Sequence, residues 1–323
     1  MHEATLAVLT GAATAAISGT ATGGLIPLLQ RLGMLDRPNE RSSHAVPTPR
    51  GGGIAPVGAV LLAVAVLVVA RCLPPQLLTV LAATLGLAVV SWIDDRRGLR
   101  PAPRLAAQAV AVALGMAALP SAGGAIPAVA AGLLWVWFIN LFNFMDGIDG
   151  LAGGEAAAIG AGLWLFATIG AGSNPETALF AAAVAGAAIG FLGWNWSPAR
   201  IFLGDVGSVP LGYLLGFLLL GAALRGWWKI ALILPLYFLA DATLTLGRRL
   251  LRGERVWQAH REHFYQQAVR SGLGHAAVTG RVIAADILLI GAGWAAENGW
   301  GTAALAAATS VVAVLLIALA LGR

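Results

Sequence analysis

Six aspartates in this sequence stand at or near the ends of long apolar runs. An ionised carboxylate beside hydrocarbon is costly, so such residues usually face a cavity and a partner. Several carboxylates that converge at one depth repel one another unless a cation neutralises them. Hard oxygen ligands of this kind suit Mg²⁺, which binds one or two carboxylates together with substrate phosphates. We therefore expect metal-assisted phosphate chemistry at these residues: Asp36, Asp94, Asp95, Asp146, Asp149 and Asp205.

Two of the segments that carry these aspartates have a characteristic spacing. Asp94 and Asp95 form a pair at the end of an apolar run. Asn140, Asn143 and Asp146 follow one another at steps of three, which in a helix keeps them near one face. The glycines after Asp146 allow the backbone to approach a ligand closely.

Two further segments carry polar groups suited to phosphate. Asn195 precedes a Gly-Asp-x-Gly-Ser run in which Asp205 begins the next apolar stretch, and the backbone N–H groups of a helix start there could hold a metal–phosphate unit. A basic loop contains His260, Arg261 and His263, whose side chains donate hydrogen bonds to phosphate. Taken singly, these segments also fit a solvated helix end, a capped loop, a turn or an exposed basic loop. Their joint position on one membrane face favours a site.

The elements that must position these residues are membrane-spanning helices. A span needs about 20 mostly apolar residues, and the abundant glycine, 42 residues, suits close helix packing in lipid. The fold class predicted is all-α, a polytopic transmembrane bundle of about eleven spans. Ten spans are also possible, because Gly and Ala dilute the fourth and fifth. The expected spans lie near 5–29, 53–71, 77–93, 104–120, 125–142, 151–171, 177–194, 207–224, 229–247, 282–297 and 302–321.

The basic residues orient this bundle. With eleven spans, all of the 20 Lys and Arg residues except Arg71, Arg225 and Lys229 fall on one side, which the positive-inside rule assigns to the cytoplasm. The N-terminus is then outside and the C-terminus inside, and the six aspartates lie on the cytoplasmic side. We expect a single membrane domain over 1–323, with its largest cytoplasmic loop at 248–281.

Composition excludes several other classes of protein. With 59% hydrophobic and 11% charged residues, the chain can neither cover a water-facing surface nor remain disordered. A single cysteine, Cys72, excludes an internal disulfide and a cysteine metal cluster. Because the basic residues punctuate apolar runs, no nucleic-acid partner is expected. The first apolar stretch lacks a basic n-region and a convincing cleavage site, so we interpret it as a retained span.

At these residues the chain resembles the polyprenyl-phosphate N-acetylhexosamine-1-phosphate transferase superfamily, also called glycosyltransferase family 4. The resemblance covers nearly the whole chain and rests on motifs in the same order. The motifs are Asp94-Asp95, the Asn140–Ala152 run, the Phe-x-Gly-Asp-x-Gly-Ser run from Phe202, and the histidine loop. A further match is the segment from Asp36 to His44, followed by Pro47 and the glycines before position 54.

The resemblance implies transfer of N-acetylhexosamine-1-phosphate from a UDP-N-acetylhexosamine to undecaprenyl phosphate, with release of UMP, at the cytoplasmic face of the bacterial inner membrane. It implies Mg²⁺ as cofactor, for which Mn²⁺ could substitute. Asp94, Asp95 and Asp205 are the expected catalytic residues. Asp205 is the principal metal ligand, Asp94 is a second ligand or the group that manages the attacking phosphate, and Asp95 supports them. Substrate-binding residues are expected in three groups: Arg41, His44 and Arg50 for the carrier phosphate; Asn140, Asn143, Asp146, Asp149 and Asn195 for nucleotide or metal-bound water; and His260, Arg261 and His263 for phosphate or sugar.

The histidine loop bears on the substrate. The peptidoglycan branch of the family, phospho-N-acetylmuramoyl-pentapeptide transferase, carries consecutive histidines there, whereas this chain has His-Arg-Glu-His from His260. The sequence looks more like the branch that initiates O-antigen or related surface polysaccharides, and the sugar stays open. Membrane lipids are expected partners, and a homodimer is allowed by the resemblance alone.

The alternative is a polytopic secondary transporter. Such sites normally lie near the bilayer midplane, whereas the expected span boundaries place Glu155, Asp241 and Asp286 toward helix ends. This placement favours the enzyme.

Overall fold

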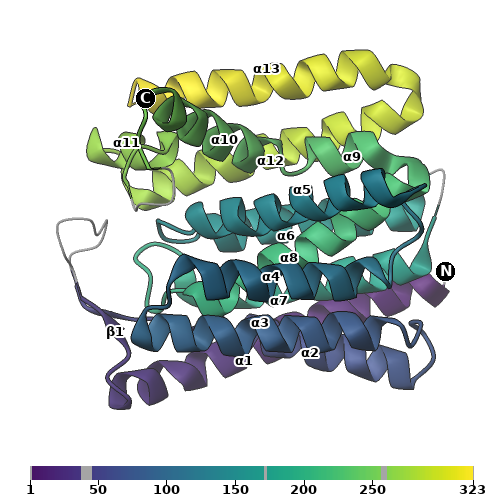
Figure 1. Cartoon of the computed structure of the whole chain (residues 1–323), viewed down its shortest axis with the longest axis horizontal. Coiled ribbons are helices and arrows are strands. Elements are labelled where there is room, and N and C mark those ends of the chain that lie inside the picture. The colour runs from purple at the N-terminus through teal and green to yellow at the C-terminus, as the bar shows by residue number, and fades with distance from the viewer. Residues whose placement is uncertain (1, 38–45, 171–172, 256–259, 323) are drawn as a thin grey trace.

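The structure, a computed structural model, describes residues 2–37, 46–170, 173–255 and 260–322. Nearly all of this part is helical, and the only strands in it are the short pair β1 (Leu35–Asp36) and β2 (Thr48–Pro49). Figure 1 shows the long helices side by side in one bundle, with the N-terminus at one end and the C-terminus at the other. The prediction of a polytopic all-α bundle is confirmed.

Every predicted span coincides with helix. The first eight spans correspond to α1 (His2–Arg31), α2 (Ile54–Val69), α3 (Leu77–Arg97), α4 (Pro101–Met116), α5 (Ala125–Phe144), α6 (Leu151–Ile169), α7 (Pro175–Asn195) and α8 (Asp205–Ala222). The rest correspond to α9 (Trp228–Ile233) with α10 (Leu236–Leu251), α12 (His275–Ala295) and α13 (Gly301–Ala320). The kinked segments η1 (Ala223–Trp227) and η2 (Ala296–Trp300) and the short helix α11 (Phe264–Arg270) complete the described chain.

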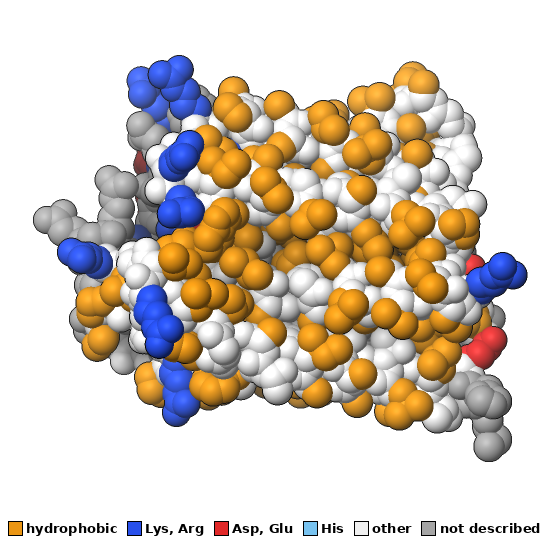
Figure 2. All heavy atoms as spheres, turned by 90° about the horizontal axis from the view of Figure 1, so that it is seen from below, with side chains coloured by type: hydrophobic (Ala, Val, Ile, Leu, Met, Phe, Trp, Pro, Cys, Tyr) orange, Lys and Arg blue, Asp and Glu red, His pale blue; other side chains and the backbone are white. Residues whose placement is uncertain are grey.

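Length and apolar composition make this a multi-pass membrane protein. In the part of the chain that the structure describes, seven helical stretches are long and apolar enough to cross a membrane, and two of them continue through η1 and η2. Figure 2 shows apolar side chains over one face of the bundle, with a row of Lys and Arg at the end where β1 and α11 lie. A belt of this kind suits hydrocarbon, and the basic row suits a membrane surface.

Two predicted spans, the ninth and the tenth, differ most from the helices observed. The ninth span is broken between α9 and α10 at Pro235, which has no N–H to continue the helical hydrogen bonds. The tenth span begins earlier than predicted, at His275, because residues 275–281 already form helix and bury Val278 and Thr279. Asp286 therefore lies in the middle of α12 and is 1% exposed, so its placement toward a helix end was wrong.

Small residues let the helices approach closely. A Cβ on Gly186 of α7 would lie 2.1 Å from the carbonyl oxygen of Gly11 in α1, and one on Gly190 would lie 2.2 Å from that of Ala15. Helices α1 and α7 thus pack backbone against backbone, as small residues permit in membranes.

Candidate active site

The aspartates of the two strongest motifs meet where α3 ends and α8 begins. Asp94 and Asp95 lie in the last turn of α3, and Asp205 is the first residue of α8. The segment before α2 aligns with the segment before α8: Phe202 N–H donates to the Pro49 carbonyl (2.8 Å) and Gly52 N–H donates to the Phe202 carbonyl (2.9 Å). These bonds bring residues far apart in the sequence to one place.

A glycine contact allows this arrangement. A Cβ on Gly53, just before α2, would lie 2.1 Å from the Cα of Gly207 in the first turn of α8. Neither position has room for a side chain, because the two backbones touch. The glycine-rich entry to α2 therefore serves to seat α2 against the start of α8.

Asp95 has two functions in this geometry. Its carboxylate accepts hydrogen bonds from the backbone N–H groups of Asp205 (3.1 Å) and Val206 (3.0 Å), so it caps α8. Its Oδ1 also lies 2.8 Å from Nη2 of Arg50, and its side chain is fully buried. The N–H groups expected to hold a metal–phosphate unit are thus occupied by Asp95. A direct catalytic role for Asp95 stays a prediction.

Two arginines neutralise the cluster. Nη2 of Arg50 also lies 3.0 Å from Oδ1 of Asp205. Burial alone would lower the pKa of the Arg50 guanidinium, but Asp95 and Asp205 raise it above its usual value. Arg104, in the first turn of α4, places Nε 2.9 Å from Oδ2 of Asp94 and Nη2 3.2 Å from Oδ2 of Asp205. One guanidinium therefore bridges the two predicted metal ligands.

Sequence reasoning missed Arg104 as a site residue and treated it only as one of the basic residues that set topology. The available signal was its place one turn after Pro101, which begins α4 and follows the Asp94–Asp95 turn directly. Asp94 is held further by the backbone N–H of Leu99, which donates to its Oδ1 (2.6 Å).

Two carboxylates of this site face one point and could hold a cation. Asp94 and Asp205 both turn carboxylate oxygens to the point that Arg104 occupies. No group of three or more His, Cys, Asp or Glu side chains suited to a metal occurs among the described residues. Because Mg²⁺ commonly takes only one or two carboxylates and completes its shell with waters and substrate phosphates, two carboxylates fit a cation that is bound together with a phosphate substrate.

The residues of the Asn-x-x-Asn-x-x-Asp run do not share one helical face, because α5 ends at Phe144 before Asp146. Asn143 accepts a hydrogen bond from the Ser208 hydroxyl of α8 (2.7 Å). Asn140 donates to Gln108 of α4 (2.7 Å) and to the Val136 carbonyl (2.8 Å). The prediction of a common face was wrong for Asp146, although all three side chains lie at the same end of α5.

Asp146 stands in the loop after α5, in the field of the acidic cluster. Burial and then Asp205 raise the pKa of its carboxyl to about 7, and Arg50 offsets part of this rise. Close to neutrality, Asp146 can therefore exist with or without its proton. This makes it sensitive to any cation or phosphate that enters the site.

Asp149 and Asn195 form a separate network that ties loops together. Oδ2 of Asp149 accepts from the Ala199 N–H (3.1 Å), and its Oδ1 lies 3.2 Å from Nδ1 of His275. Burial would raise the pKa of Asp149, but the bonds from His275 and Ala199 lower it below its usual value. Asn195 accepts from the Gly150 N–H (3.0 Å) and donates to the Ile201 carbonyl (2.9 Å). Their predicted role toward nucleotide or metal-bound water stays a prediction.

The histidine loop packs next to the loop after α5. Tyr265 of α11 donates its hydroxyl hydrogen bond to the Phe144 carbonyl (3.0 Å), and a Cβ on Gly147 would lie 2.1 Å from that hydroxyl oxygen. His263 is buried, whereas His260 and Arg261 are half-buried. Of the other predicted carrier-phosphate residues, Arg41 and His44 lie outside the described residues.

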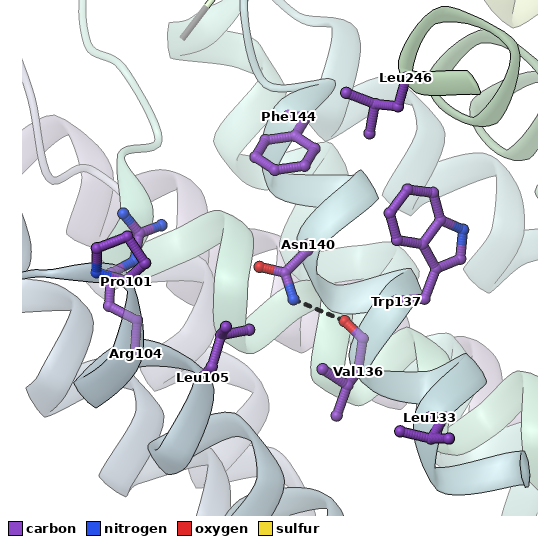
Figure 3. Close-up of a pocket in the computed structure, with 9 residues that line it drawn as sticks. All are labelled: Pro101, Arg104, Leu105, Leu133, Val136, Trp137, Asn140, Phe144 and Leu246. Atoms are coloured by element: carbon purple, nitrogen blue, oxygen red, sulfur yellow. Dashed lines mark hydrogen bonds between the residues drawn. The ribbon is translucent and has the colours of Figure 1, made fainter. Parts of the chain in front are cut away.

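An apolar groove leads from this cluster to the side of the bundle. A cavity of about 380 Å³ opens between α4, α5 and α10. Arg104 stands at its polar end, and Figure 3 shows Arg104 and Leu105 across the cavity from Asn140 and Val136 of α5. Leu105 and Leu133 in its lining are largely exposed, so the groove faces the surroundings of the bundle. Its lining is Pro101, Arg104, Leu105, Leu133, Val136, Trp137, Asn140, Phe144 and Leu246.

Fold and site together define a multi-pass membrane protein whose carboxylates and arginines meet at one end of the bundle, beside a groove open to the side. Comparisons with known proteins identify the family to which it belongs. Residues 77–223 match the family described as glycosyl transferase family 4. The chain is 30% identical over 316 residues to decaprenyl-phosphate N-acetylglucosaminephosphotransferase of Mycobacterium tuberculosis, covering 83% of this chain and 76% of that protein. The chain belongs to glycosyl transferase family 4.

Relatives of another kind are also similar. The chain is 34% identical over 222 residues to a phospho-N-acetylmuramoyl-pentapeptide-transferase of Trichormus variabilis, covering 58% of each chain. It is 35% identical over 218 residues to the protein of that name from Shouchella clausii, with 58% of this chain and 66% of that protein covered. The chain thus spans little more than half the length of the Trichormus relative. The superfamily predicted from the motifs is confirmed, and the relatives do not decide between its branches.

Proposed function

We propose that this protein transfers N-acetylhexosamine-1-phosphate from a UDP-N-acetylhexosamine to undecaprenyl phosphate and releases UMP, at the cytoplasmic face of the bacterial inner membrane. The observation that carries the proposal is the double position of Arg104. It belongs both to the acidic cluster, through Asp94 and Asp205, and to the lining of the apolar groove. A lipid phosphate needs this combination, because its chain requires an apolar channel and its headgroup requires a cation at the end of that channel.

The reaction joins two polyanions. An oxygen of the lipid phosphate attacks the phosphorus that carries the sugar, a new P–O–P bond forms, and the bond to the uridine phosphate breaks so that UMP leaves. No base is required, because the second pKa of a phosphate monoester is about 6 and the attacking oxygen is already ionised. Catalysis of phosphoryl transfer is mainly positioning and charge neutralisation. Arg50 and Arg104 supply positive charge for the second task.

The residues divide between the two substrates. Arg104, with Arg50, holds the lipid phosphate at the end of the groove. Asp205 and Asp94 would hold Mg²⁺, or Mn²⁺ in its place, together with the pyrophosphate. When bound, this cation would polarise the phosphate oxygens and neutralise their charge. Asp95 supports the site by capping α8. The nucleotide sugar would be bound by Asn143, Asp146, Asp149, Asn195, His260 and Arg261, and Arg41 and His44 are proposed for the carrier phosphate.

The substrate branch is proposed from the histidine loop. His260 and His263 are separated by Arg261 and Glu262, unlike the consecutive histidines of the muramoyl-pentapeptide branch. The relative from Mycobacterium is named for N-acetylglucosamine phosphate transfer, which supports a UDP-N-acetylhexosamine donor. The lipid-linked product would start a surface polysaccharide such as O-antigen. A homodimer is a further proposal that rests on the resemblance.

One observation favours a second candidate, a secondary transporter. Glu155 of α6 and Asp286 of α12 are buried inside the bundle, and Asp286 lies at mid-helix. Intramembrane carboxyl groups often mark ion pathways. The cluster at Asp94 and Asp205 and the family membership both favour the transferase.

A labelled UDP-sugar panel tests the proposal. Purified protein in liposomes with undecaprenyl phosphate and Mg²⁺ is given UDP-N-acetylglucosamine, UDP-N-acetylgalactosamine or UDP-N-acetylmuramoyl-pentapeptide. We expect label in the organic extract with one of the first two donors, together with UMP and dependence on added Mg²⁺. Label that accumulates in the vesicle lumen without a lipid product would support transport. Label transferred only from the pentapeptide donor would overturn the proposed branch.

A further inference from the structure

A buried carboxylate in α10 holds the histidine loop. Asp241 is 0% exposed and lies in the interior of α10. Its oxygens accept hydrogen bonds from the backbone N–H groups of Phe264 (3.1 Å) and Tyr265 (3.3 Å), so it caps α11. They also accept from the hydroxyls of Tyr237 (3.1 Å) and Thr245 (3.3 Å). Sequence reasoning assigned no role to this aspartate.

The same carboxylate fixes an imidazole. Nδ1 of His263 lies 3.0 Å from Oδ1 of Asp241, and the ring is 2% exposed. Because an ionised carboxylate can only accept hydrogen bonds, this contact assigns the ring hydrogen of His263 to Nδ1, on the side of Asp241. A carboxylate behind an imidazole fixes both the tautomer and the ring plane in this way.

The fixed ring sits inside a stack of three. The rings of His263 and Tyr265 lie 5.6 Å apart at 18°, and those of His263 and His260 lie 4.8 Å apart at 30°. At one end of the stack, the Tyr265 hydroxyl abuts the loop that carries Asp146. At the other end, His260 is only half-buried and is the member that faces outward. The orientation of His260 therefore depends on a ring that Asp241 holds.

The hydrogen bonds of His260 define what it can offer. Its Nδ1 accepts from the Glu262 N–H (3.3 Å), and Glu262 is itself held by Arg249 (2.9 Å). Burial, followed by the neighbouring His263 and Arg249, lowers the pKa of His260 to about 4, so the ring is neutral near pH 7. With Nδ1 occupied as an acceptor, the proton of the neutral ring lies on Nε2. His260 can then donate one hydrogen bond to an oxygen.

We propose that Asp241 is a positioning residue: it holds His263, and through the ring stack it presents Nε2–H of His260 to an oxygen of the nucleotide sugar. This rests on the proposed function. The simpler interpretation is that Asp241 only caps α11. The two interpretations differ in what a neutral isostere should change. Oδ1 accepts from the Phe264 N–H and contacts His263, and Oδ2 accepts from the Tyr265 N–H and Tyr237, so an amide, which has one oxygen, loses the acceptor on one of the two sides. A capping role alone predicts only lower stability, whereas the positioning role also predicts a higher KM for the UDP-sugar.

The central variant is Asp241→Asn, with Tyr237→Phe as the matched control. Tyr237→Phe removes one donor to the same carboxylate and leaves the contact to His263. We expect Asp241→Asn to raise KM for the UDP-sugar by roughly 10–100-fold, as loss of a partner that orients a site histidine does, with KM for undecaprenyl phosphate unchanged. Tyr237→Phe should keep both constants within about twofold, since it loses a single neutral hydrogen bond. His260→Ala should match Asp241→Asn, and the double variant should lose no more than either single one.

Nitrogen-15 NMR of histidine in the wild-type protein gives a readout that needs no variant to fold. We expect a proton on Nδ1 of His263 and on Nε2 of neutral His260. The opposite tautomers would overturn the proposal, as would Asp241→Asn with a lowered melting temperature and unchanged KM values. Two measurements on the same proteins separate the proposed function from the positioning role. Absence of turnover in the wild-type protein would reject the proposed function. Calorimetric binding of UDP-N-acetylglucosamine that is equally tight in wild type and Asp241→Asn would reject the positioning role.

Discussion

Two groups of acidic side chains in this protein face opposite electrostatic conditions. At the ends of α3 and α8, Asp94, Asp95 and Asp205 are matched by Arg50 and Arg104 within 3.2 Å. Inside the bundle, Glu155 of α6 and Asp286 of α12 interact with each other, and none of their four oxygens has a hydrogen-bond donor in the part of the chain that the structure describes. We call Asp94, Asp95 and Asp205 the paired cluster, because arginines pair with them, and we call Glu155 and Asp286 the unpaired cluster.

The difference indicates which carboxylates can remain charged. An isolated charge buried in a low-dielectric interior costs far more than folding can supply, so such a group gives up its charge. The unpaired cluster must therefore hold at least one proton, which would join the two carboxyl groups by a hydrogen bond. The paired cluster can stay ionised at the membrane surface. Only ionised carboxylates can bind a divalent cation, so the chemistry belongs to the paired cluster.

The largest effect should come from removing one charge from each cluster in turn. Asp205→Asn keeps the size of the side chain but removes its charge, and we expect the rate of UMP release to fall roughly 100–1000-fold, as loss of a preorganised electrostatic group does. Glu155→Gln replaces an acid that can be protonated with an amide of the same shape, and its rate should stay within about twofold of wild type. A coupled assay for UMP measures both. Equal losses in the two variants would erase the distinction between the clusters.

The next effect concerns the cation that joins cluster and groove. Arg104→Ala leaves Asp94 and Asp205 facing one another, and we expect kcat/KM for undecaprenyl phosphate to fall roughly 10–100-fold through the loss of a charge-assisted contact. Arg104→Lys should recover only part, because a point charge cannot bridge two carboxylates as a guanidinium does. Arg100→Ala is the control, since Arg100 is an exposed basic residue just before α4. A similar loss in Arg100→Ala would mean that general surface charge, not the bridge, attracts the lipid.

The paired cluster also shows which features of the site could be predicted from the sequence and which could not. The helices were predictable because each is an apolar run of spanning length. The convergence of Asp94 and Asp205 was predictable because both stand beside apolar runs on the same side. The two functions of Asp95 and the bridge made by Arg104 were not, since these contacts join residues about 100 positions apart and leave no local periodicity. The contact of Gly53 with Gly207 is similar: a glycine run signals freedom of the backbone but not which backbone it meets.

The position of Asp286 in the unpaired cluster was also not predictable from the sequence. Asp286 was placed near a helix end because the predicted loop 248–281 included residues 275–281, yet these residues form the first two turns of α12. When a helix begins outside the apolar region and continues into it, hydropathy marks the start of the apolar run and not the start of the helix. The contacts of Asp241 were not predicted for a related reason, because its partners at the start of α11 lie more than 20 residues away.

A moderate effect on stability should distinguish a shared proton from two independent acids. Glu155→Ala leaves Asp286 buried without its partner, and we expect a loss of about 1–3 kcal/mol in the free energy of unfolding. Glu155→Gln should lose less, since its amide can donate to Asp286. Thermal unfolding in detergent, followed by circular dichroism, compares the two variants. Should Glu155→Gln be as unstable as Glu155→Ala, Asp286 would not be accepting a hydrogen bond, and the idea of a shared proton would fail.

The last expected effect depends on pH and lies at Asp146, whose carboxyl is acted on by both Asp205 and Arg50. Its pKa of about 7 in the folded protein exceeds the value near 3.9 for an unfolded aspartate. Between these values the folded state binds the additional proton, so stability falls as pH rises from about 4 to 7 and then levels off. Asp146→Asn lacks this term, and its melting temperature relative to wild type should rise from pH 5 to pH 7 and stay constant above. A difference that is flat across this range would show that Asp146 is already ionised at pH 5 and belongs with the paired cluster.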